Sequence, residues 1–129
     1  MKSKSFEDVA VWRKAHTWVL AIYKFTENFP KHELFGLTSQ LRRAAVSVPA
    51  NFAEGFKKRT TPDKIRIYNI AQGSLEGCRY FLILARDLHY GDSRSLIRAM
   101  EEISRMLKAI SVRLERHRSI DYWLLATVY

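Results

Sequence analysis

The sequence contains few residues that cross-link or interrupt a polypeptide chain. Among 129 residues there are one cysteine, Cys78, three prolines and five glycines. A single cysteine excludes a disulfide within the chain and gives no indication of an oxidising compartment. No low-complexity tract or linker is visible, so the length predicts a single domain over residues 1–129.

Long apolar runs are also missing. Tyr80–Ala85 is one of the two longest, with six residues, far short of the roughly 20 residues that cross a bilayer. At the N-terminus, Glu7 and Asp8 interrupt the only stretch that resembles the apolar core of a signal peptide. These absences predict a cytoplasmic protein with no membrane partner.

Acidic residues are outnumbered. There are 13 Asp and Glu against 22 Lys and Arg, a formal net charge of +9. Such an excess favours polyanionic partners, either RNA or DNA or an acidic protein surface. The alternative is that the charge only keeps the protein in solution. Hydrophobic residues make up 47% of the chain, enough for a packed core without a metal or disulfide.

Apolar residues recur every three or four positions, which is the period of an α-helix. The pattern predicts helices over about residues 6–29, 33–56, 61–90 and 93–117. Short connections between long helices force neighbours to run antiparallel. The predicted fold class is therefore all-α, an up-and-down antiparallel four-helix bundle.

Turn and capping residues set the expected helix ends. Thr61 is the expected N-cap of the third helix, with Pro62 at its first position. Gly91 is expected to end that helix, and Asp92 or Ser93 to cap the fourth. Residues 118–129 form an apolar tail that either folds back on the bundle or docks on a neighbouring subunit, and we favour docking.

The second helix has three distinct faces. Besides its core face it carries a polar stripe, which is either a hydrogen-bonded ladder across a helix seam, the interpretation we favour, or a binding site. The residues of a third line along the helix are small and apolar and point away from the core, which indicates an oligomer interface. The polar stripe consists of Arg43, Ser47, Asn51 and Glu54, and the apolar line of Val46, Ala50 and Ala53.

Several ordered motifs resemble one known family. They include Phe6-Glu-Asp-Val, Trp12-Arg-Lys-Ala15, Ala71-Gln-Gly-Ser-Leu75 and, most strongly, Val46-Ser-Val-Pro-Ala-Asn-Phe-Ala-Glu-Gly55. Over residues 6–117 the chain resembles the four-helix-bundle proteins encoded in intervening sequences of bacterial large-subunit ribosomal RNA genes. Family members tend to have Glu and Leu where this chain has Gly77 and Cys78.

The resemblance implies a ring-like homopentamer, so one expected partner is a second copy of the chain. More distantly it implies kinship with the accessory variability proteins of diversity-generating retroelements, which bind a reverse transcriptase and nucleic acid through a basic surface. It also marks a set of family-signature polar residues: Arg42, Arg43, Ser47, Asn51 and Glu54.

No arrangement of residues indicates catalysis, a metal or another cofactor. The four histidines are far apart in sequence, and no Glu-x-x-His pair of a bundle di-iron site is present. Cys78 falls on an apolar stripe, as a small buried hydrophobe would. Gly73 and Gly77 do not form a phosphate loop, and their spacing of four indicates close helix–helix packing. We therefore expect a protein without enzymatic activity.

Basic residues are the remaining functional candidates. They comprise Lys57, Lys58 and Arg59 at the second turn, and Arg94, Arg98, Arg105 and Arg116 in one sector of the last helix. Contact would be made mainly to phosphates. The predicted function is electrostatic binding of nucleic acid, RNA in particular, as an accessory of a ribonucleoprotein or a reverse-transcribing element. The alternative is a protein–protein scaffold that docks an acidic partner.

Overall fold

A computed structural model describes the backbone of residues 5–128 and the side chains of residues 5–118. It contains four α-helices and two single-turn 3-10 helices, and no strand is present in the described residues. The all-α prediction is therefore confirmed. The elements are η1 (Phe6–Asp8), α1 (Ala10–Thr26), η2 (Lys31–Glu33), α2 (Leu37–Lys57), α3 (Thr61–Asp87) and α4 (Arg94–Val128).

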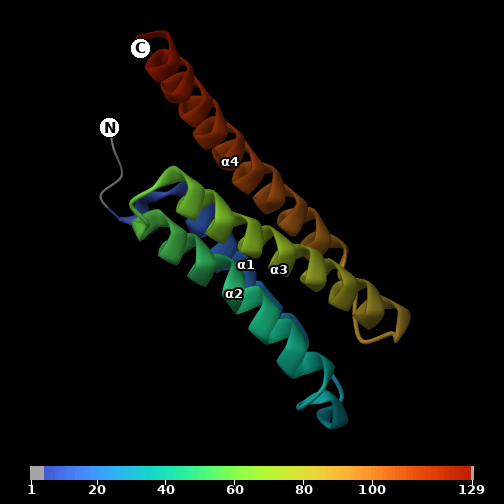
Figure 1. Cartoon of the computed structure of the whole chain (residues 1–129). Helices are drawn as coiled ribbons and strands as arrows, with labels where there is room; N and C mark the ends of the chain where they lie inside the picture. Colours follow the sequence, from blue (N-terminus) through green and yellow to red (C-terminus); the bar gives the residue numbers. More distant parts are fainter. Residues whose placement is uncertain (1–4, 129) are drawn as a thin grey trace.

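The four helices alternate in direction and close into a bundle (Figure 1). Each helix packs against its neighbours in sequence, and α4 returns to pack against α1. The α1–α2 and α3–α4 connections lie at one end of the bundle, while the α2–α3 connection lies at the other end with the start of α1. The antiparallel four-helix bundle predicted from the sequence is thus observed.

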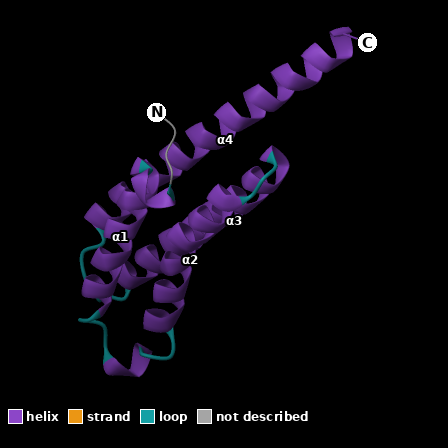
Figure 2. Ribbon diagram, turned by 90° about the vertical axis from the view of Figure 1, so that its left-hand side faces the viewer, coloured by secondary structure: helices purple, strands orange, loops and turns teal. Residues whose placement is uncertain are grey.

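The last helix is longer than the sequence pattern predicts. It spans 35 residues, and its final part extends beyond the other three helices in both views (Figures 1 and 2). The prediction of a helix ending at residue 117 and a separate tail over residues 118–129 is wrong, because no Gly or Pro is present there to end the helix. Docking of this segment lies outside the residues whose side chains are described.

The first two helices begin later than the sequence predicts. Val9 has an extended backbone with φ −88° and ψ 128°, so η1 and α1 are separate and α1 starts at Ala10 rather than residue 6. Before α2, the chain makes the single turn η2 and passes through Gly36, so α2 starts at Leu37 rather than residue 33.

The caps of α3 also differ from the prediction. The N-cap is Thr60, whose hydroxyl accepts a hydrogen bond from the Asp63 amide, so Pro62 occupies the second helical position. The helix ends at Asp87 because His89 takes a left-handed conformation with φ 63°. The amide of Tyr90 then bonds the Ala85 carbonyl at 2.9 Å, which closes a Schellman-type cap without glycine.

All four helices contribute to one hydrophobic core. Its fully buried side chains include Ile22 from α1, Leu41 from α2, Leu75 and Leu82 from α3, and Met100 from α4. Cys78 is also completely buried, as predicted, and burial raises the pKa of its thiol to about 12. A thiol in this environment stays protonated and does not act as a nucleophile.

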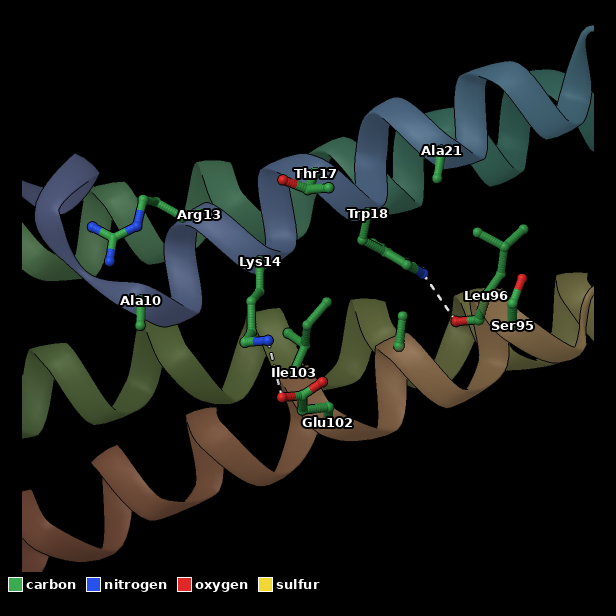
Figure 3. Close-up of a pocket in the computed structure, with 11 residues that line it drawn as sticks. Ala10, Arg13, Lys14, Thr17, Trp18, Ala21, Ser95, Leu96, Glu102 and Ile103 are labelled. Atoms are coloured by element: carbon green, nitrogen blue, oxygen red, sulfur yellow. Dashed lines mark hydrogen bonds and ion pairs between the residues drawn. The ribbon is translucent and has the colours of Figure 1, made fainter.

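Two buried hydrogen bonds fix the start of α4. The indole Nε1 of Trp18 donates to the Leu96 carbonyl oxygen at 3.1 Å (Figure 3). The hydroxyl of Ser93 donates to the Leu82 carbonyl oxygen at 3.0 Å. These contacts tie the first turn of α4 to both α1 and α3.

The glycines of the helices provide a matched test of this packing. A Cβ at Gly55 would lie 2.6 Å from the buried Tyr68 ring, whereas one at Gly77 would meet nothing within 4 Å. We expect Gly55→Ala to lower the free energy of unfolding by about 1–3 kcal/mol through overpacking. Gly77→Ala should raise it by about 0.5–1 kcal/mol, because alanine favours helix. Urea denaturation measures both, and equal effects of the two changes would contradict this packing.

Candidate nucleic-acid interface

Arg42 is occupied by contacts within the bundle. Its Nε donates to the Thr26 hydroxyl at 2.8 Å, and its Nη2 donates to the Tyr23 carbonyl at 3.2 Å. The guanidinium carbon also lies 4.6 Å from the centroid of the Tyr23 ring. Arg42 therefore caps the C-terminal carbonyls of α1, where a positive charge is favourable.

Two residues of the polar stripe form a hydrogen-bonded ladder. The Ser47 hydroxyl lies 2.7 Å from the Ala44 carbonyl oxygen and 2.6 Å from the Ser74 hydroxyl on α3. The Asn51 side chain donates to the Ser47 carbonyl at 2.7 Å. All of these groups are partly buried, so the ladder joins α2 to α3 rather than forming a free binding surface.

The other two residues of the stripe are exposed. Arg43 faces solvent, and Glu54 has a single ion-pair contact, 3.8 Å from Lys58 Nζ. The stripe that the sequence presents as one unit is thus divided between a buried seam and an open surface.

The apolar line of α2 lies on the outside of the bundle. Val46 is 40% exposed, Ala50 is exposed and Ala53 is partly exposed. On α3, Ile70 and Tyr80 are exposed as well. A Cβ at Gly73 or Gly77 would meet nothing within 4 Å, so the expectation that these glycines pack closely against another helix is wrong within the protomer.

We define the α2–α3 outer face by the exposed small and apolar residues of these two helices. Isolated apolar residues on a surface are ordinary, but a line of them along one helix is typical of an interaction surface. The members are Val46, Ala50, Ala53, Ile70, Gly73, Gly77 and Tyr80.

The basic residues do not form one patch. Lys57, Lys58 and Arg59 lie at the α2–α3 connection, at the opposite end of the bundle from the start of α4 (Figure 1). The arginines of α4 lie on its outer face, and Arg98 and Arg116 are separated by about 27 Å along the helix axis. They are Arg94, Arg98, Arg105 and Arg116, all exposed.

The cations differ in how much of their charge is neutralised. Arg94 makes a two-pronged contact with Asp92, with an Nη2–Oδ2 distance of 2.8 Å, which lowers the pKa of Asp92 to about 2. Lys58 lies near Glu54. Among residues 5–118, no carboxylate forms an ion pair with the remaining candidates, which are Lys57, Arg59, Arg98, Arg105 and Arg116.

A groove of about 560 Å³ runs between α1 and α4 (Figure 3). Small side chains, including Ala10, Ala21 and Ala99, leave it open above Trp18. Its cations are already engaged: Lys14 pairs with Glu102 at 3.0 Å, and Arg13 donates to the backbone carbonyl of Asp8 at 2.7 Å. The charge of Lys14 is therefore neutralised, and Arg13 is held by backbone acceptors.

A larger groove of about 870 Å³ lies between the first half of α3 and the middle of α4. Reasoning from the sequence missed it, because a groove between helices depends on their register and separation, which no local pattern encodes. Most of its lining residues have polar side chains, of which two are basic, although much of the surface they present is apolar. The lining consists of Ile65, Asn69, Gln72, Ser104, Lys108, Ser111, Val112, Glu115 and Arg116.

Sites of other kinds are not seen in the described part of the chain. No group of three His, Cys, Asp or Glu residues comes together there. None of the helices in that part combines the length and apolarity that a bilayer crossing needs.

Comparison with known proteins identifies relatives of this fold. The family model described as 23S rRNA-intervening sequence protein matches residues 7–110. A crystal structure of a protein of unknown function, from the S23 ribosomal protein family of Bacteroides thetaiotaomicron, is similar with a TM-score of 0.71 and 26% sequence identity. The match covers 79% of this chain and 98% of that chain. No curated protein is significantly similar to this chain.

The two halves of the polar stripe can be separated by mutation. Asn51→Ala should lower the free energy of unfolding by about 0.5–1.5 kcal/mol, because a partly buried hydrogen bond to Ser47 is lost. Glu54→Ala should change it by no more than a few tenths of a kcal/mol, because a single exposed ion pair contributes little. Urea denaturation of both variants checks this. A cost at Glu54 as large as that at Asn51 would show that the stripe acts as one unit.

Proposed function

The chain belongs to the 23S rRNA-intervening sequence protein family, and on this basis we propose that it is a non-enzymatic protein that binds RNA electrostatically. The observation that carries the proposal is the set of exposed cations on α4 and at the α2–α3 connection that have no carboxylate partner among the described residues. The link to ribosomal RNA in the family, and the ribosomal name of the structural neighbour's family, agree with RNA as the polyanion.

The distribution of ion pairs supports this proposal. Seven different carboxylates in the described residues already face a lysine or arginine. The excess positive charge therefore stays on the surface instead of being cancelled inside the bundle. Unpaired arginines spaced along one helix contact the phosphates of a nucleic acid strand without reading its bases.

We further propose that the protein assembles with copies of itself through the α2–α3 outer face. Its small residues allow the backbone of a second copy to approach closely, and Ile70 and Tyr80 supply apolar area. The proposed assembly is a ring, with five subunits implied by the family resemblance. In such a ring the exposed cations of α4 are repeated in every subunit, so that weak contacts in each subunit add to a strong total affinity.

The proposed setting is the cytoplasm, where the protein would serve as an accessory of a ribonucleoprotein. A role beside a reverse transcriptase depends on the distant resemblance to retroelement accessory proteins and stays a prediction. The second candidate function, a scaffold that docks an acidic protein, is favoured by the exposed apolar residues of the α2–α3 outer face together with the exposed cations elsewhere on the bundle.

RNA binding predicts a steep dependence on salt. Between 50 mM and 200 mM salt, the affinity for a short structured RNA should fall by at least about tenfold, because phosphate contacts release counterions. Fluorescence anisotropy of a labelled RNA measures this. An acidic protein docked through an apolar core would show a shallow dependence, and no binding at 50 mM salt would overturn the proposed function.

Self-association predicts that one substitution separates folding from assembly. Ala50→Glu should reduce the mass measured by light scattering to that of smaller species, because a charge would be buried in the interface. Helicity measured by circular dichroism should be nearly unchanged, since Ala50 is exposed in the protomer. The matched control is Ala109→Glu on the outer face of α4. If Ala50→Glu assembles like the unsubstituted protein, the α2–α3 outer face is not the interface.

A further inference from the structure

The groove between α3 and α4 combines features that suit one unit of a nucleic acid. We propose that it holds a single nucleotide of single-stranded RNA, with the phosphate at Lys108 and Arg116 and the base against the walls of the groove. This inference rests on the proposed RNA binding and names the place where a strand leaves the outer face of α4 and enters the bundle.

The inner end of the groove is closed by a pair of mutual hydrogen bonds. Gln72 Nε2 donates to the Ser104 carbonyl at 2.9 Å, and the Ser104 hydroxyl donates to Gln72 Oε1 at 2.9 Å. Toward the start of α3, α4 diverges from α3 (Figure 1). The groove thus has a fixed polar floor at one end and opens toward the end of the bundle that carries the α2–α3 connection.

Two polar side chains of the groove take no part in the Gln72–Ser104 pair. The hydroxyl of Ser111 is shielded from solvent and has no hydrogen-bond partner among the described residues. The carboxamide of Asn69 is exposed and takes no part in the Gln72–Ser104 pair. A carboxamide both donates and accepts, which matches the mixed donor and acceptor edge of an unpaired base.

Positive charge in this groove is free, in contrast to the α1–α4 groove. Lys108 and Arg116 are exposed and form no ion pair with the described residues. The only carboxylate in the lining is that of Glu115, which lies 3.8 Å from Arg118. In the α1–α4 groove, by contrast, Lys14 is held by Glu102.

The groove is also large enough for a single nucleotide. The volume of about 870 Å³ lies within the range of small-molecule sites, roughly 300–1,000 Å³. Ile65 and Val112 give the walls an aliphatic surface, against which the face of an unstacked base can lie. A base inside a duplex cannot enter, so the groove should distinguish single strands from duplexes. The arginine row of the outer face outside the groove, Arg98 and Arg105, should not.

Two paired variants on one helix test the groove. Lys108→Ala/Arg116→Ala removes the groove cations, and Arg98→Ala/Arg105→Ala removes the same charge from the same outer face outside the groove. Anisotropy with a labelled single-stranded RNA of ten nucleotides should show a loss of affinity about fivefold larger for the groove pair, since that pair also loses the contacts of the seated nucleotide. With a duplex of the same sequence, both pairs should lose affinity equally.

A substitution without charge gives an independent readout. Asn69→Leu fills the groove from an exposed position, so the fold measured by circular dichroism should be retained. It should weaken single-strand binding and leave the salt slope unchanged, because no phosphate contact is removed.

The outcomes separate the groove from the proposed function. If the two paired variants weaken single-strand binding equally and Asn69→Leu has no effect, the groove is not the site, while RNA binding stands. If the unsubstituted protein binds neither RNA, the proposed function itself fails. A nucleoside 5′-monophosphate that binds as tightly as the oligonucleotide would assign the groove to a free nucleotide and overturn the strand model.

Discussion

The placement of α4 depends on two buried donors that meet its first turn. Trp18 reaches the Leu96 carbonyl from α1, and Ser93 reaches the Leu82 carbonyl on α3. Leaving either donor unpaired inside the core would cost a large part of the stability of a small domain. Because both contacts lie at one end of α4, they fix its direction there, and its distant half is free to diverge from α3. The groove between α3 and α4 and the outward direction of the arginine row both follow from this anchoring.

The cations of this protein fall into two groups. Arg42 and Lys64 each donate to carbonyls at the end of a helix, Arg42 on α1 and Lys64 on α2 at 2.6 Å from the Phe56 oxygen. Arg79 joins α3 to α4 through Glu101 at 2.9 Å. These residues stabilise the fold, and their donor groups are already committed to acceptors within the protein. Only the cations without such contacts are available for binding. The net charge of +9 therefore overstates the positive charge that a ligand meets. Where the available cations lie matters more than the total charge.

The helical period of the sequence was enough to predict the fold class, and the line of Val46, Ala50 and Ala53 on α2 was correctly expected to face away from the core. Helix ends were predicted less well because they depend on competition between adjacent residues. Thr60 caps α3 although Thr61 is chemically equivalent, and His89 takes a conformation usual for glycine. The α3–α4 groove could not be predicted, since Asn69 and Ser111 come together only through the register of two antiparallel helices. The spacing of Gly73 and Gly77 was recognised in the sequence, but it could not be predicted that no other part of the protomer packs against them.

Those two glycines also affect the dynamics of α3. Each lacks the side chain that limits backbone freedom in a helix, and nothing in the protomer covers the space beside it. The middle of α3 should therefore open locally more often than it would with alanine at these two positions, although its inner face carries Leu75 and Cys78 in the core. A second copy that covers this surface would suppress such opening. The exchange rate of the amide hydrogens around Gly73 and Gly77 would then follow the state of assembly, and this helix would report directly on whether the protein is alone or in a ring.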